Sequence, residues 1–212
     1  RAKGNGGNHY SFYVSDMGEH AAQHLRLEGA LQRALQREEF LLHYQPVVDI
    51  ASGQVSGVEA LIRWQPHGRP MVPPGDFIPL AEETGLIVPI GEWVLATAMA
   101  QHVAWRRSGL PPVRISVNLS ARQFLGQDVA QHVAALLEKT GCDPAYLTLE
   151  ITESVLMQNP TAAAETMARL AGMGLQLAID DFGTGYSSLA SLKRFPIHSL
   201  KIDRSFVMDL TQ

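Results

Sequence analysis

The sequence predicts an α/β fold in which mostly parallel strands alternate with helices, at a spacing that suits a barrel of βα units. Short apolar runs rich in Val, Ile and Leu alternate with longer segments of helical periodicity. Gly and Pro residues punctuate these segments, as at Gly109 and Gly141. The chain has 212 residues and is 46% hydrophobic, which is enough for a substantial core.

The first part of the chain is expected to belong to a different unit from the rest. Residues 1–17 begin with a basic, glycine-rich stretch and continue into a possible short strand at 9–14, so we expect them to be the tail of an upstream domain. Apolar residues recur at helical spacing from 21 to 39, which predicts an amphipathic linker helix within 18–39. The main domain is expected over 40–212.

The main domain is predicted to begin with a β-hairpin and to continue as alternating helices and strands. The predicted strands cover residues 41–48, 55–62, 113–117, 146–151, 175–179 and 198–202. The predicted helices cover residues 92–107, 128–140, 161–171 and 187–194. For the third helix, Asn159 is the expected N-cap, Pro160 the first residue, and Gly174 lies just past the end.

The number of strands leaves two interpretations open. A complete β/α barrel needs eight strands and about 250 residues. Only six strands can be placed, and the sequence ends at Gln212, shortly after the sixth. The fold is therefore either an unfinished barrel or an open sheet.

Composition excludes several classes of function. The formal net charge is −4 and the sequence pI is about 6.1, which argues against binding a nucleic acid polymer or an anionic membrane. Cys142 is the only cysteine, so an intrachain disulfide or a thiolate metal site is excluded and a cytoplasmic location is expected. No apolar run approaches the roughly 18 residues of a membrane span.

Polar side chains end five successive predicted strands. These residues are Glu59, Asn118, Glu150, the pair Asp180 and Asp181, and Lys201, which is followed by Asp203. Taken singly, each acid is better explained as a cap or a solvated strand end, but together they should converge because carboxyl ends of parallel strands face one way. No arginine cluster accompanies them, so hard divalent cations, Mg²⁺ or Mn²⁺, are the expected counter-charge. Two such ions could activate water for in-line attack on a phosphodiester, and Lys201 could bind a phosphate oxygen or steer that water.

The motifs around these residues resemble the EAL family of bacterial phosphodiesterases that hydrolyse cyclic di-GMP. The resemblance covers residues 41–210. The matching motifs are Gln45-Pro46-Val47, Glu59-Ala60-Leu61-Ile62-Arg63-Trp64, residues 77–82 with Thr84-Gly85, Asn118-Leu119-Ser120, Glu150-Ile151-Thr152-Glu153, residues 180–185, and Lys201-Ile202-Asp203.

The resemblance implies a role for each matching position. The implied metal ligands are Glu59, Asn118, Glu150, Asp180 and Asp181, the last for a second ion. The implied catalytic residues are Glu59, Glu150, Asp181 and Lys201, and the implied substrate contacts are Gln45, Leu61, Arg63, Asn118 and Asp203. Glu153 would anchor the loop at 181–188, which the family uses in dimer contacts and in shaping the metal site. The product would be linear pGpG.

The resemblance also implies a TIM-like (β/α)8 barrel with an antiparallel first strand, apparently truncated here after the sixth strand. The family has another catalytic Glu at the end of strand seven, which this sequence does not include, so activity of this chain by itself is an open question. Residues 1–17 would be the end of a GGDEF domain, and a homodimer through the EAL domain is expected. The alternative function is a receptor or regulatory module that binds cyclic di-GMP without hydrolysing it.

Overall fold

The structure, a computed structural model, describes residues 15–126, 128–184 and 192–208. Its first half contains α1 (Ser15–Ala34), β1 (Phe40–Val48), β2 (Val55–Trp64), α2 (Pro74–Thr84), α3 (Ile87–Arg107), β3 (Arg114–Asn118) and α4 (Ala121–Gly126). Its second half contains α5 (Val129–Thr140), the 3-10 helix η1 (Pro144–Tyr146), β4 (Leu147–Thr152), α6 (Glu153–Gln158), α7 (Pro160–Gly172), β5 (Gln176–Phe182), β6 (Ser199–Ile202) and α9 (Arg204–Met208).

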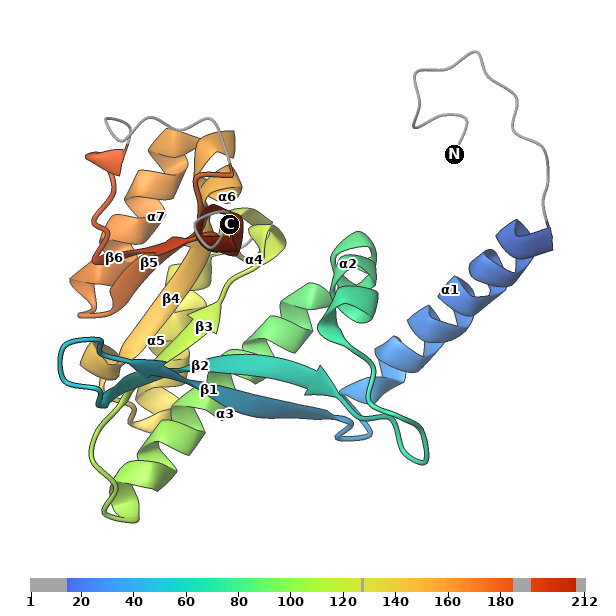
Figure 1. The fold of residues 1–212 in the computed structure, drawn as a ribbon, viewed down its shortest axis with the longest axis horizontal. Coiled ribbons are helices and arrows are strands. Elements are labelled where there is room, and N and C mark those ends of the chain that lie inside the picture. Colours follow the sequence, from blue (N-terminus) through green and yellow to red (C-terminus); the bar gives the residue numbers. More distant parts are fainter. Residues whose placement is uncertain (1–14, 127, 185–191, 209–212) are drawn as a thin grey trace.

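The described strands form one sheet in the order β1-β2-β3-β4-β5-β6. The β1–β2 pair is antiparallel and the following four pairs are parallel, as the predicted hairpin and βα units require. Helix α5 contacts both α3 and α7 alongside the sheet, whereas α1 projects away from it (Figure 1). Strands β1 and β6 are the two edges of this sheet, so the described strands form an open sheet with the strand order of a barrel.

Capping residues place the helix ends close to where the sequence puts them. The Asn159 side chain accepts a hydrogen bond from the Ala162 amide at 3.2 Å, and α7 begins at Pro160 as predicted. Asp128, predicted as the first residue of its helix, is instead the N-cap of α5 and accepts from the Gln131 amide at 3.0 Å.

Four helices were missed, namely α2, α4, α6 and the five-residue α9, and one was predicted too short. Helix α2 contains Pro79, and α4 and α6 have six residues each, so none shows a sustained apolar period. Helix α3 begins five residues before the predicted start, at Ile87. Its first turns contain Gly91, whose missing Cβ leaves the space that the Gln123 amide fills, at 2.0 Å from the ideal Cβ position. Tertiary packing therefore outweighs the poor helix propensity of this segment.

Other predicted elements differ by their ends or lie outside the described residues. Helix α1 stops at Ala34 rather than 39, and β5 continues past Ile179 to Phe182 with an irregular register. The predicted strand at 9–14 and most of the predicted helix at 187–194 fall on residues that the structure does not describe.

Candidate metal centre

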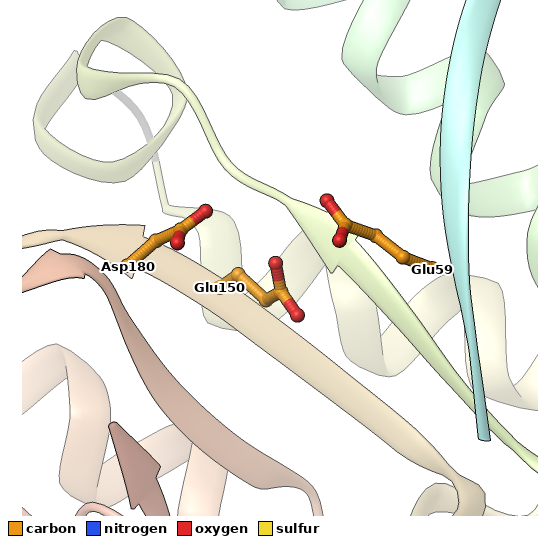
Figure 2. A group of neighbouring side chains, drawn as sticks. All are labelled: Glu59, Glu150 and Asp180. Carbon is orange, nitrogen blue, oxygen red and sulfur yellow. The ribbon is translucent and has the colours of Figure 1, made fainter. Parts of the chain in front are cut away.

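Three carboxylates from three different strands meet at the carboxyl edge of the parallel strands. Glu59 lies on β2, Glu150 on β4 and Asp180 on β5, and one oxygen of each lies within 4.8 Å of the others. Figure 2 shows the three side chains pointing toward a common space. The sequence therefore predicted that these three residues converge, but the structure places them inside their strands and not at the strand ends, Glu59 being in the middle of β2.

The Lys201 ammonium on β6 lies among the three carboxylates. Its Nζ donates to Glu59 Oε2 at 3.2 Å and to Asp180 Oδ2 at 3.1 Å, and it donates a third, short hydrogen bond to Glu150 Oε2. The sequence argument assigned all of the counter-charge to divalent cations. The structure differs, because a cation of the chain itself provides part of that charge.

Burial and charge shift the pKa values at this centre in opposing ways. Burial raises the pKa of the Glu150 carboxyl, although the Lys201 hydrogen bond lowers it. Burial lowers the pKa of Lys201, but hydrogen bonds to Glu150 and Asp180 outweigh it and the net pKa is raised. The Lys201 side chain is 33% exposed and that of Glu150 only 4%, so the charge that most needs a partner is Glu150.

Asn118 supports the centre from β3. Its side-chain amide donates to Glu59 Oε1 at 2.8 Å, while Lys201 holds the other Glu59 oxygen. Both oxygens of Glu59 are thus engaged, and its orientation is fixed. Gln45 lies directly opposite Glu59 in the register of the β1–β2 hairpin.

A cavity of about 320 Å³ shares Asn118 with this group, although none of the three carboxylates lines it. It is lined by Leu61, Arg63 and Asn118, which are three of the predicted substrate contacts, together with residues of α2 and α3. The Arg63 guanidinium donates to the Ile62 carbonyl at 2.8 Å within this region. Asp203, another predicted contact, accepts from the Ser205 amide at 3.0 Å at the start of α9. The structure thus brings Leu61, Arg63 and Asn118 to one cavity but gives Asp203 a local capping contact.

Strand β5 is irregular just after Asp180, where its backbone adopts a constrained conformation before Phe182 pairs with β6 again. Asp181 has a φ of 52° and its side chain is exposed, outside the group of three carboxylates. The buried Glu153 accepts from the Gly183 amide at 3.0 Å, so it contacts the loop that it was predicted to anchor. Residues 185–188 of that loop lie outside the described residues.

One contact of this loop was not anticipated. Gly183 has a φ of 100°, and an added Cβ would lie 2.7 Å from the Phe206 ring on α9. The ring therefore packs directly over the backbone just after Asp181. The sequence signal for this contact is a glycine two residues after Asp181, but nothing in the sequence identifies the aromatic partner.

The donor set fits a hard divalent cation. Three carboxylates on adjacent parts of one sheet edge supply oxygen only, which suits Mg²⁺ or Mn²⁺ better than zinc. Lys201 holds one oxygen of each carboxylate, so a cation bound to those oxygens would have to share or displace the hydrogen bonds.

Comparison with known proteins relates this chain to enzymes of one family. The family model described as EAL domain matches residues 28–212. The bifunctional diguanylate cyclase/cyclic di-GMP phosphodiesterase MucR of Pseudomonas aeruginosa is 46% identical over 209 residues, covering 99% of this chain and 30% of MucR. The cyclic di-GMP phosphodiesterase PdeR of Escherichia coli is 38% identical over 209 residues, covering 99% of this chain and 31% of PdeR. This chain thus spans about 30% of the length of these curated relatives.

Solved structures show the same architecture. The PaMucR phosphodiesterase in its c-di-GMP complex matches with a TM-score of 0.84 and 45% identity, covering 88% of this chain and 76% of that one. The EAL enzyme Bd1971 bound to cAMP and cyclic di-GMP matches with a TM-score of 0.81 and 33% identity, covering 92% and 55%. The predicted α/β class and the antiparallel first strand are therefore confirmed.

Proposed function

The chain belongs to the EAL domain family, and on that premise we propose that it forms the catalytic domain of a phosphodiesterase that hydrolyses cyclic di-GMP to linear pGpG. The observation that carries the proposal is the group of Glu59, Glu150 and Asp180, whose oxygens lie within 4.8 Å of one another. Two relatives, MucR and PdeR, are named as cyclic di-GMP phosphodiesterases, which supports the choice of substrate.

In this proposal Glu59, Glu150 and Asp180 hold Mg²⁺ or Mn²⁺, with Asn118 beside them, and Asp181 serves a second ion. When bound, such ions lower the pKa of water and neutralise charge that develops on a phosphate. The hydrogen bond from Asn118 holds Glu59 in its orientation before any cation arrives. Burial of Glu150 makes an unpaired charge there costly, so a bound cation would have to neutralise Glu150 when Lys201 turns to the substrate.

The remaining predicted residues act on the dinucleotide. Leu61 and Arg63 line the cavity beside the carboxylates, where the Arg63 guanidinium can pair with a phosphate. Gln45 and Asp203 are proposed as further substrate contacts. Lys201 is proposed to bind a phosphate oxygen or the attacking water once the carboxylates hold a cation. Water adds to one phosphorus, the P–O3′ bond breaks, and the freed 3′ oxygen takes a proton.

Chromatography of cyclic di-GMP after incubation with Mg²⁺ or Mn²⁺ tests the function, with this chain and the full-length protein that contains it run side by side. We expect a pGpG peak from the full-length protein and a loss of at least ~100-fold for Glu59→Ala or Asp180→Ala, because each removes a metal-ligand charge. Glu138→Ala, on the exposed face of α5, is the matched control. Near-normal rates in either ligand variant would exclude the proposed metal centre, and tight binding without turnover would indicate the receptor function.

Glu153 provides a second test of the same site. Glu153→Ala removes the carboxylate that holds the Gly183 amide, so we expect a weaker response to added metal with an unchanged fold. A full response to metal, measured as the Mn²⁺ concentration for half-maximal rate, would exclude the anchoring role.

The wider organisation is also a proposal. We propose a homodimer through the EAL domain, residues 1–17 as the end of a GGDEF domain, a linker within 18–39, and the EAL domain from residue 40. The greater length of the curated relatives supports additional domains. Within the described residues, none of the helices is long and apolar enough to span a bilayer. Light scattering of the full-length protein tests the dimer.

A further inference from the structure

A second cleft, separate from the metal centre, lies between α1 and the turn that follows β2. Its volume is about 690 Å³, and none of its lining residues lines the cavity beside the carboxylates. The basic residues of its lining are Arg26, Arg33, Arg37, His67 and Arg69. We call this feature the arginine cleft.

The arginine cleft is strongly positive in a chain that is negative overall. Four guanidinium groups face one lining carboxylate, that of Glu39, which gives a net charge of +3 with His67 neutral. The whole chain carries −4. This local excess is therefore not a consequence of composition, and a concave basic surface attracts anions.

The spacing of the arginines on α1 places them along one line. At 100° per residue, positions 26, 33 and 37 fall within about 40° of one another around the helix axis. Arg37 lies beyond the last residue of α1, but its amide still donates to the Arg33 carbonyl at 3.0 Å and continues the helical path. Gly29 leaves space beside the Arg33 side chain, whose Nη1 lies 3.6 Å from the ideal Cβ position of that glycine.

The opposite wall is a turn held by its own hydrogen bonds. The Gln65 side chain donates to the Arg69 carbonyl at 2.6 Å, and the Arg69 amide donates to the Pro66 carbonyl at 3.1 Å. Between the walls, the buried Trp64 indole donates to Glu39 Oε2 at 3.1 Å. Glu39 is thus already engaged, and the turn presents Arg69 from a fixed backbone.

The four guanidinium groups are available to a ligand. Among the side chains of residues 25–126, 128–184 and 192–208, no ion pair involves Arg26, Arg33, Arg37 or Arg69. Arginine forms paired hydrogen bonds with phosphate oxygens, and several guanidiniums on two walls can contact several phosphates at once.

We propose that the arginine cleft binds a small anion that carries consecutive phosphate groups, such as a nucleoside polyphosphate. The helical rise of 1.5 Å per residue separates Arg26 from Arg37 by about 16 Å, which exceeds the length of a triphosphate and leaves room for an attached nucleoside. The cleft includes the α1 helix that precedes the sheet, so occupation would stiffen the connection between α1 and the EAL domain. This binding is independent of the hydrolytic activity proposed above.

Isothermal titration of this chain with inorganic tripolyphosphate in EDTA tests the proposal, because without metal the three carboxylates repel anions. We expect saturable binding to one site that weakens at least tenfold in Arg33→Gln/Arg37→Gln. Arg33→Lys/Arg37→Lys keeps the charge and should recover part of the affinity. Arg107→Gln, at the end of α3 and outside the cleft, should bind like the parent. Circular dichroism of each variant checks that α1 and the sheet are intact.

A second titration, with a nucleoside triphosphate, distinguishes a nucleotide ligand from an inorganic polyphosphate. Tighter binding than tripolyphosphate, lost in the same double variant, would support a nucleotide ligand. Equal binding of the two would support a site for the polyphosphate alone. Absence of tripolyphosphate binding, or equal losses in Arg107→Gln and the double variant, would overturn the proposal.

Discussion

Replacing Lys201 by methionine should destabilise the metal-free protein and make it depend on divalent cations. The substitution removes the ammonium that hydrogen-bonds Glu59, Glu150 and Asp180, while keeping most of the side-chain volume. Breaking a fully buried ion pair costs about 3–5 kcal/mol. Glu59 and Asp180 are each 19% exposed and Lys201 33%, so water recovers part of that cost and we expect about 2–3 kcal/mol.

This loss should be visible as a change in melting temperature. For a chain of this length, 1 kcal/mol corresponds to roughly 2–4 °C, so Lys201→Met should melt about 4–12 °C below the parent in EDTA. Added Mn²⁺ should restore most of the difference, because the cation then neutralises the same oxygens without competition from the ammonium. Differential scanning fluorimetry across a Mn²⁺ titration measures both effects.

Lys193→Met, at an exposed position, is the control and should change neither the EDTA melting temperature nor the gain with Mn²⁺. The reasoning would be refuted by a Lys201→Met variant that melts like the parent in EDTA. It would also be refuted by a gain with Mn²⁺ no larger than that of the parent.

Three further outcomes are expected. Asn118→Ala removes the hydrogen bond to Glu59 and should raise the Mn²⁺ concentration for half-maximal stabilisation by about tenfold. An unchanged Mn²⁺ concentration would show that this hydrogen bond does not support the metal centre. Gly183→Ala should lower the free energy of unfolding by about 1–3 kcal/mol, because of backbone strain and the clash with Phe206. If the clash contributes, this loss, measured by urea unfolding, should be smaller in a Phe206→Ala background. Burial raises the pKa of Tyr44 to about 12 from 10.0, so its contribution to stability is complete below pH 10 and is lost as pH rises through 12. Between pH 9 and pH 11, the free energy of unfolding of Tyr44→Phe should therefore rise by about 1 kcal/mol relative to that of the parent. If urea unfolding shows the same pH dependence for both proteins, the prediction is wrong.

Sequence reasoning worked best where one physical signal acts alone. Apolar runs located all six described strands to within about three residues, since a buried strand needs continuous hydrophobicity. Capping at Asn159 was predicted because a side-chain oxygen followed by proline is a local signal. Helix α2 was missed because Pro79 and Gly75 hide its period, and Gly91 concealed the start of α3.

The candidate site likewise has a part that the sequence predicted and a part that it did not. That Glu59, Glu150 and Asp180 converge was predicted from their place after apolar strand residues and from the common direction of parallel strands, although all three lie inside their strands. Lys201 was expected in the same group, but its hydrogen bonds to all three carboxylates were not, since the contact with Glu59 joins positions 142 residues apart and depends on the sheet twist and side-chain rotamers.

The sequence by itself determined the α/β class, the antiparallel hairpin, the positions of the strands and the acids that converge from them. These follow from local periodicity and from the common direction of parallel strands. Only the tertiary structure decided which charge neutralises the acids, which ring packs over Gly183 and which arginines share a cleft. Each of these features brings together segments that are distant in the sequence. Packing sets the distance between those segments in space, and no local pattern in the sequence predicts it.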